Sequence, residues 1–214
     1  MESGTVDVGI MPPATYAQAR EMGVAKAILS TTLNDYDENE QLMPGVPVGS
    51  FKAEVLVRAD SGITGYEGLA GKTIAYLGAS SASGYIYPSL WLQERYGKTL
   101  ADLDNAVQSD SYTTSLARLA SGQADVMVSF GHIRTKNAAD WQEKLGGTDE
   151  MVKQTGIIGV TEPIYNDMIA YSKNSELMQD EDFRKALGDS FIELAETDEG
   201  KEIFSVFSQI GYEW

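Results

Sequence analysis

One stretch, residues 73–97, limits most strongly what this chain can fold into. An apolar strand pattern at Thr73–Leu77 ends in the turn Gly78–Tyr85, which is rich in glycine and serine, and a helical pattern then runs to Gly97. A strand that leads through small residues into a helix places free backbone N–H groups and hydroxyls at the positive end of that helix. The turn is therefore either an anion cradle or a flexible loop before a serine N-cap, and the peptide alone leaves both readings open.

The composition excludes several classes of partner. Among 214 residues there are 16 basic and 32 acidic side chains, so the net charge is −16, and no basic cluster is present to follow a phosphate backbone. We therefore expect no nucleic-acid partner. The chain has no cysteine and one histidine, His132, which rules out thiolate metal sites, cysteine nucleophiles and disulfides. We expect neither a metal nor a cofactor.

Membrane and targeting segments are not evident in the sequence. No apolar run approaches the roughly 20 residues that span a bilayer. Met1 leads directly into Glu2, Ser3 and Gly4 without the pattern of a signal peptide. We therefore expect that any signal segment is absent from this chain.

Strand and helix patterns alternate along the chain, which favours parallel sheets covered by helices on both faces. The clearest helix is predicted at Tyr112–Ser121, before Gly122 and a buried strand, whereas residues 34–50 have the composition of a loop. Pro, Ser and Thr are concentrated at three junctions that lead into helices, Pro12–Thr15, Ser80–Ser83 and Ser109–Thr114. Ligands of open α/β sheets bind beyond the carboxyl ends of the strands, so these junctions predict a common crevice.

These features together resemble the phosphonate/phosphate-type substrate-binding proteins of ABC importers. The stretches that carry the resemblance follow the order of the family across nearly the whole chain. They are Val6–Tyr16, Val55–Ile63, Leu69–Thr73, Ser81–Pro88, Gly122–Val126 and Pro163–Asp167. The serine turn followed by Gly-Tyr and by Pro88 is the most specific of them.

The resemblance implies an α/β fold with two lobes of the periplasmic-binding-protein type, each a mainly parallel sheet flanked by helices. Lobe 1 is expected at 1–57 and 168–214, and lobe 2 at 58–167. Residues 51–58 and 163–172 are expected to be the two strands that cross between the lobes.

The resemblance also implies units before Val6 that this chain does not contain. We therefore expect the first lobe to be incomplete at its start. An incomplete sheet exposes unpaired backbone groups along its edge. Either the chain is truncated at its start, or a partner segment, for example one supplied by self-association, covers that edge.

The family's ligand contacts correspond to eight residues of this sequence. They are Ser81, Ala82, Ser83, Gly84, Tyr112, Asp167, Met11 and Pro12. By resemblance, Ser81 and Ser83 donate hydroxyls to the oxyanion, beside the backbone of Ala82 and Gly84. Ala82 stands where the family often has threonine.

The remaining contacts leave the identity of the anion open. Tyr112 stands where some members have histidine, and it could reach the anion. Asp167 matches an acidic residue that faces the amino group in aminoalkylphosphonate binders. Met11, next to Pro12, stands where a phosphonate binder can have an aromatic wall.

The function implied is capture of a small phosphorus oxyanion, a phosphonate, phosphate or phosphite, between two lobes that close over it. An ABC permease would then receive the ligand from this extracytoplasmic component. The alternative is a sensor or interaction domain of the same fold whose cleft has degenerated. We expect no enzyme activity, because Ser81, Ser83 and His132 lie in no nucleophile-elbow pattern.

Overall fold

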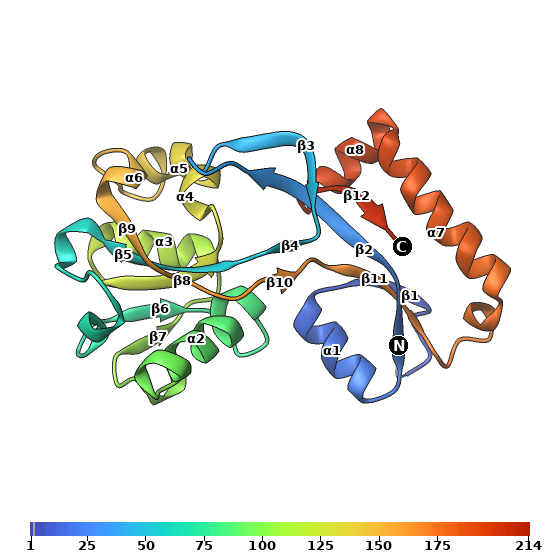
Figure 1. The fold of residues 1–214 in the computed structure, drawn as a ribbon, viewed down its shortest axis with the longest axis horizontal. Helices are drawn as coiled ribbons and strands as arrows, with labels where there is room; N and C mark the ends of the chain where they lie inside the picture. Colours follow the sequence, from blue (N-terminus) through green and yellow to red (C-terminus); the bar gives the residue numbers. More distant parts are fainter. Residues whose placement is uncertain (2) are drawn as a thin grey trace. The chain divides into compact units, whose positions relative to one another are not determined.

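The computed structural model describes residues 1 and 3–214, which form two compact units (Figure 1). Unit 1 comprises Met1–Phe51 and Tyr165–Trp214, and unit 2 comprises Lys52–Ile164. Both boundaries lie earlier in the chain than the sequence predicts. The first boundary differs because strand β5, Ala53–Arg58, pairs along its whole length within the sheet of unit 2 and so belongs there.

Two short strands lie where the chain passes from one unit to the other. Strand β4, Ser50–Phe51, ends unit 1 on the outward path, and β10, Ile164–Tyr165, lies on the return path. The two strands pair with each other as a small separate sheet. The crossing segments are therefore tied together by backbone hydrogen bonds.

Unit 1 contains a sheet in the order β1-β11-β2-β12, with β3 also paired to β2. Its elements are β1 Val8–Met11, α1 Pro13–Glu21, β2 Ala25–Tyr36, β3 Leu42–Val48, β11 Met168–Ser172, α7 Glu181–Glu196, α8 Asp198–Ser205 and β12 Gln209–Glu213. The core on this sheet joins Leu29 and Ile169 to Phe204 and Tyr212 from the end of the chain.

The mainly parallel sheet that the sequence predicts for the first lobe is wrong for unit 1. Strands β1 and β2 do run in the same direction, as a strand–helix–strand unit should. Strand β11 is inserted between them and pairs antiparallel with both, and β12 and β3 also pair antiparallel with β2. The periodicity of a strand does not specify its neighbour, so this insertion is a property of the tertiary fold.

The loop predicted at residues 34–50 is also wrong, because the end of β2 and the whole of β3 lie there. Both strands form an antiparallel hairpin in which Asn34 is opposite Pro47 and Tyr36 is opposite Leu42. Proline is tolerated in an edge strand because one side of that strand needs no ladder hydrogen bonds. Because β3 is exposed and contains two prolines, its sequence resembles that of a loop.

Unit 2 contains a mixed sheet in the order β7-β6-β8-β5-β9. Its elements are β5, β6 Ile74–Tyr76, a π-helical turn Ala82–Ile86, α2 Tyr87–Tyr96, β7 Ala106–Gln108, α3 Tyr112–Ser121, β8 Val126–Phe130, α4 Ile133–Lys136, α5 Ala138–Glu143, α6 Met151–Gln154 and β9 Thr155–Val160. Strands β7, β6 and β8 are parallel, and β5 and β9 are antiparallel additions. The parallel part of the prediction therefore holds for the three strands that lead into the predicted crevice.

Each face of this sheet carries its own hydrophobic core. Val55 and Val57 pack on the side of Trp91 from α2, whereas Leu56 packs on the side of Trp141 from α5. Successive side chains of a strand point to opposite faces, so this division follows directly from the apolar run of β5. A strand buried on both faces explains why that run does not alternate.

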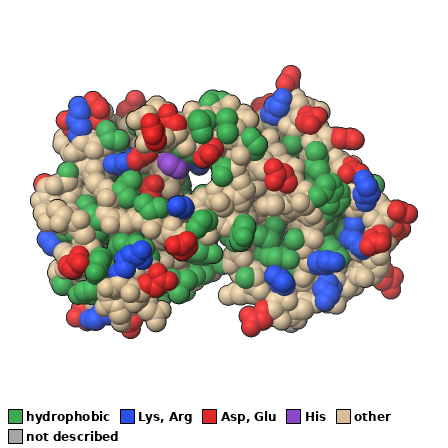
Figure 2. All heavy atoms as spheres, viewed as in Figure 1, with side chains coloured by type: hydrophobic (Ala, Val, Ile, Leu, Met, Phe, Trp, Pro, Cys, Tyr) green, Lys and Arg blue, Asp and Glu red, His purple; other side chains and the backbone are tan. Residues whose placement is uncertain are grey.

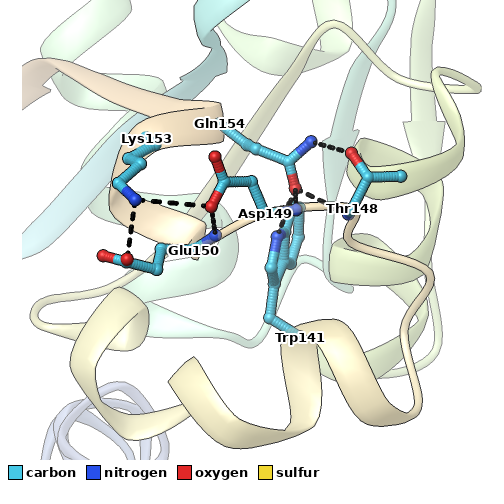
Figure 3. A network of polar contacts seen from close by, with 6 residues as sticks. All are labelled: Trp141, Thr148, Asp149, Glu150, Lys153 and Gln154. Atoms are coloured by element: carbon cyan, nitrogen blue, oxygen red, sulfur yellow. Dashed lines mark hydrogen bonds and ion pairs between the residues drawn. The ribbon is translucent and has the colours of Figure 1, made fainter.

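The segment around Trp141 is organised by one glutamine (Figure 3). The Trp141 side chain is 1% exposed, and its Nε1–H donates to Oε1 of Gln154 over 2.9 Å. That oxygen also accepts from the backbone N–H groups of Thr148 and Asp149, at 2.9 and 3.1 Å. At Gly147 a Cβ would lie 2.1 Å from Trp141 Nε1, so only glycine fits there. The sequence gives no sign of this network.

We predict that Gln154→Ala lowers the free energy of unfolding by about 1–3 kcal/mol, because it leaves the indole N–H buried without an acceptor. Lys153→Ala is the matched control on the same helix, since it removes only exposed ion pairs to Asp149 and Glu150. Urea denaturation followed by circular dichroism measures both. Equal shifts of the two midpoints would contradict this role of Gln154.

Candidate anion site

The serine turn at the end of β6 forms one turn of π-helix that continues into α2. Ser81 caps this turn: its Oγ accepts from the N–H of Gly84 at 3.1 Å. Its carbonyl accepts from the N–H groups of Tyr85 and Ile86, at 3.1 and 3.0 Å. Pro88 then lies in the first turn of α2, where its missing N–H costs no helical hydrogen bond. The reading as a serine N-cap is therefore confirmed, whereas the anion cradle stays a prediction.

The cradle has two backbone donors available. Within the described part of the chain, the N–H groups of Ala82 and Ser83 have no hydrogen-bond acceptor. The first N–H groups of a helix lack partners within it and point outward. The position of these donors depends on Gly84, where a Cβ would lie 2.8 Å from Leu77 Cβ and 2.8 Å from Ser81 Oγ. Glycine allows the turn to lie directly against the strand.

Tyr112 brings a third hydroxyl to the two serines. Ser83 Oγ and Tyr112 Oη are 2.8 Å apart, and either can be the donor. Burial raises the pKa of the Tyr112 hydroxyl, although hydrogen bonds with Ser83 and Ser81 act in the opposite direction. The tyrosine therefore keeps its proton at neutral pH. The structure thus places the predicted residues Ser81, Ser83 and Tyr112 together.

The N-terminus of α3 is built in the same way as the cradle. Ser111 caps the helix, because its Oγ accepts from the N–H of Thr114 at 3.1 Å. Thr114 in turn donates its hydroxyl to Asp110 over 2.6 Å. The side chain of Tyr112 is fixed by Phe130, whose ring it meets edge to face at a centroid distance of 5.0 Å. Phe130 is the last residue of β8 and was not predicted as part of the site.

The sheet explains why these groups meet. Strands β6, β7 and β8 are parallel neighbours, so their carboxyl ends lie at one edge of the sheet. The cradle follows β6, the cap of α3 follows β7, and Phe130 ends β8. Ligands of parallel sheets bind at this edge. Two of the three predicted junctions, Ser80–Ser83 and Ser109–Thr114, therefore meet at this edge, and the crevice itself stays a prediction.

The remaining predicted residues belong to unit 1, where they lie close together. Met11 ends β1 and is paired with Met168 of β11, and Asp167 directly precedes that residue. Pro12 follows Met11 and is the N-cap of α1. Burial raises the pKa of the Asp167 carboxyl. That Met11, Pro12 and Asp167 contact the same ligand as the cradle stays a prediction.

A neighbour that the sequence analysis did not single out holds Asp167 in place. Asn166 is 1% exposed, and its Nδ2 donates to the carbonyls of Thr31 and Val48 at 3.0 and 2.7 Å. The carbonyl of Asp167 accepts from the N–H of Thr31 at 2.9 Å. Asn166 therefore fixes the backbone from which the Asp167 side chain extends. In the sequence, the only indication of this role is that an asparagine directly precedes the predicted acidic residue Asp167.

Among the described residues there is neither a metal-binding cluster nor a membrane-spanning helix. No group of three or more His, Asp or Glu side chains among them could hold a metal ion. None of the helices formed by these residues is both long and apolar enough to cross a bilayer.

The comparisons with known proteins agree with this fold. The family model described as "ABC transporter, phosphonate, periplasmic substrate-binding protein" matches residues 1–213. A Xanthomonas citri protein with bound chloride superposes with a TM-score of 0.72 at 20% identity, over 99% of this chain and 72% of that one. Prochlorococcus marinus PhnD1 in complex with methylphosphonate gives 0.69 at 16% identity, over 96% of this chain and 71% of that one.

A binding protein of a Pseudomonas aeruginosa ABC phosphonate transporter also has the fold, with a TM-score of 0.69 at 14% identity, over 97% of this chain and 63% of that one. No curated protein matches the sequence. Identities this low show the fold alone, whereas the family model covers almost every residue. The chain belongs to the phosphonate-type periplasmic substrate-binding proteins of ABC transporters.

Proposed function

We propose that this protein captures a small phosphorus oxyanion, a phosphonate, phosphate or phosphite, at the cradle and presents it to an ABC permease. One observation carries the proposal: the Ser83 and Tyr112 hydroxyls lie 2.8 Å apart beside the N–H groups of Ala82 and Ser83, which have no acceptor among the described residues. The family consists of transport components and works outside the cytoplasmic membrane. We propose the same extracytoplasmic location here.

The donors of the cradle fit the oxygens of a phosphorus oxyanion. Each oxygen of such an anion accepts several hydrogen bonds, and bonds to an ionised acceptor are stronger than those between neutral groups. The chain itself is acidic, and Figure 2 shows carboxylate side chains on the visible faces of both units. Their repulsion is screened over about 8 Å at physiological salt, so short contacts decide binding.

We propose further that unit 1 contributes Asp167, Met11 and Pro12 to the ligand. A carboxyl group whose pKa is raised by burial gains stability from an ammonium group beside it, because the opposite charge favours the ionised form. Asp167 therefore suits the amino group of an aminoalkylphosphonate. The closure of two lobes over the ligand stays a prediction.

The first test is a thermal-shift titration of protein that has been unfolded, washed and refolded to remove bound ligand. Methylphosphonate, phosphate or phosphite at about 100 times its Kd should stabilise the fold by about 2.7 kcal/mol and raise Tm. Sulfate at equal ionic strength is the control for general salt effects. If no phosphorus oxyanion raises Tm, the capture function is wrong and the alternative of a sensor or interaction domain is favoured.

The same titration tests Asp167. In wild type, 2-aminoethylphosphonate should raise Tm more than methylphosphonate does, because it adds the ammonium partner. Asp167→Asn should abolish this difference and leave the response to methylphosphonate in place. A preference for the amino compound that survives in Asp167→Asn would remove Asp167 from the site.

A second prediction tests whether the cradle, rather than a neighbouring part of the helix, binds the ligand. Ser83→Ala removes a donor to an ionised ligand, a loss of about 1.5–3 kcal/mol, and should raise the Kd for the ligand found above by about tenfold or more. Ser89→Ala is the matched control, because Ser89 is also a buried serine on this helical segment but its Oγ has no partner among the described residues. Isothermal titration calorimetry measures both. An equal Kd for Ser83→Ala and wild type would disprove the cradle.

We also propose that a second copy of the chain covers the open edge of the unit 1 sheet. Strand β1 pairs with β11, and no other strand of the described residues pairs with β1. The apolar side chains of Val6 and Ile10 near this edge are 45% and 39% exposed. An exposed edge with apolar side chains favours pairing with another strand.

Light scattering across a concentration series should therefore detect a dimer, and Ile10→Lys should shift it toward monomer, because a charged side chain opposes edge pairing. Val107→Lys is the control, since it places the same change on β7, the edge strand of unit 2. A wild-type protein that stays monomeric throughout the series would refute this proposal without affecting the capture function.

A further inference from the structure

The donors gathered at the cradle are all electrically neutral. Two backbone N–H groups and the hydroxyls of Ser81, Ser83 and Tyr112 supply hydrogen bonds but no positive charge. The chain as a whole carries a net charge of −16. A doubly charged ligand at this place would gain strongly from a cation nearby, because an opposite charge at short range stabilises it.

The sheet edge that carries the cradle also carries a lysine. Helix α4 follows β8 after a two-residue turn, and Lys136 is its last residue. The Nζ of Lys136 lies 5.1 Å from the centroid of the Phe130 ring. The same ring packs against Tyr112 at 5.0 Å, and Tyr112 bonds to Ser83 over 2.8 Å. A continuous series of contacts within unit 2 therefore connects the ammonium group to the cradle.

The Lys136 ammonium has no anionic partner within the described residues. No ion pair and no hydrogen bond engages its Nζ there, although the lysines at 144, 153 and 185 each pair with a carboxylate. Lys136 is an exposed residue. The protein atoms around the ammonium lower its pKa by desolvation, which an anionic partner would offset.

The face of an aromatic ring holds a cation in place without using its N–H donors. Phe130 therefore keeps the three donors of Lys136 free for a ligand. We propose that Lys136 supplies the positive charge for the oxyanion bound at the cradle and so selects doubly charged over singly charged oxyanions. This inference rests on the capture function proposed above.

The test compares Lys136→Gln with Lys144→Gln, in which a solvent-exposed lysine paired with Asp140 is changed in the same way. Calorimetry at pH 8.5 measures the Kd of methylphosphonate, present there as a dianion, and of methanesulfonate, a monoanion of similar size, at low and high salt. Melting curves without ligand check that both variants fold.

Lys136→Gln should raise the Kd of methylphosphonate by about tenfold, change that of methanesulfonate much less, and weaken the salt dependence. Lys144→Gln should bind as wild type does. If wild type binds methylphosphonate and Lys136→Gln binds it equally well, the inference is wrong while the capture function stands. An equal loss for both anions overturns the charge selection. If wild type binds no phosphorus oxyanion at all, both proposals fail.

Discussion

The site depends on the parallel alignment of three short strands in unit 2. Because β6, β7 and β8 run in one direction, the segments that follow them emerge at one edge of the sheet. Ser83, Tyr112 and Phe130 come from three different segments, and this alignment alone brings them within contact of one another. The antiparallel strands β5 and β9 are not among these three strands, and their side chains contribute to the hydrophobic cores. A site that only binds an anion needs hydrogen-bond donors in fixed positions and no catalytic groups.

Local patterns were sufficient to predict the elements that build the cradle. Helix α3 begins at Tyr112 and ends at Ser121 as predicted, because a serine cap, an apolar stripe and a glycine stop coincide there. Ser81 and Ser83 stand out because a serine-rich turn between a strand and a helix suits either a helix cap or an anion site. The pattern of helix junctions places Tyr112 near the same edge of the sheet, and the family resemblance alone assigns it a contact with the anion. The hydrogen bond between Ser83 and Tyr112 joins residues far apart in sequence and has no local signature.

The failures concern strand partners and long-range contacts. Nothing in the pattern of Met168–Ser172 indicates that it enters between β1 and β2, because a strand of period two can pair in either direction. Strand β3 was read as loop because an exposed edge strand tolerates Pro44 and Pro47. Trp141 gave no sign of its role, since its partner Gln154 looks like an ordinary surface residue. In each case the information lies in the fold rather than in the segment.

In the proposed site, orientation and charge of the ligand would be recognised by different residues, whereas a single charged residue in the cradle would do both. An ammonium placed within the helix start would compete with the neighbouring N–H groups for the same oxygens and would be costly to desolvate without a ligand. The Lys136 ammonium lies over the ring of Phe130, and Lys136 is an exposed residue, whereas the neutral donors would fix the position of the ligand. Ser81, Ser83 and Tyr112 would then recognise the shape of the anion, and Lys136 would recognise its charge. Such a division allows the charge preference of the site to change by one substitution without disturbing the cap that Ser81 forms.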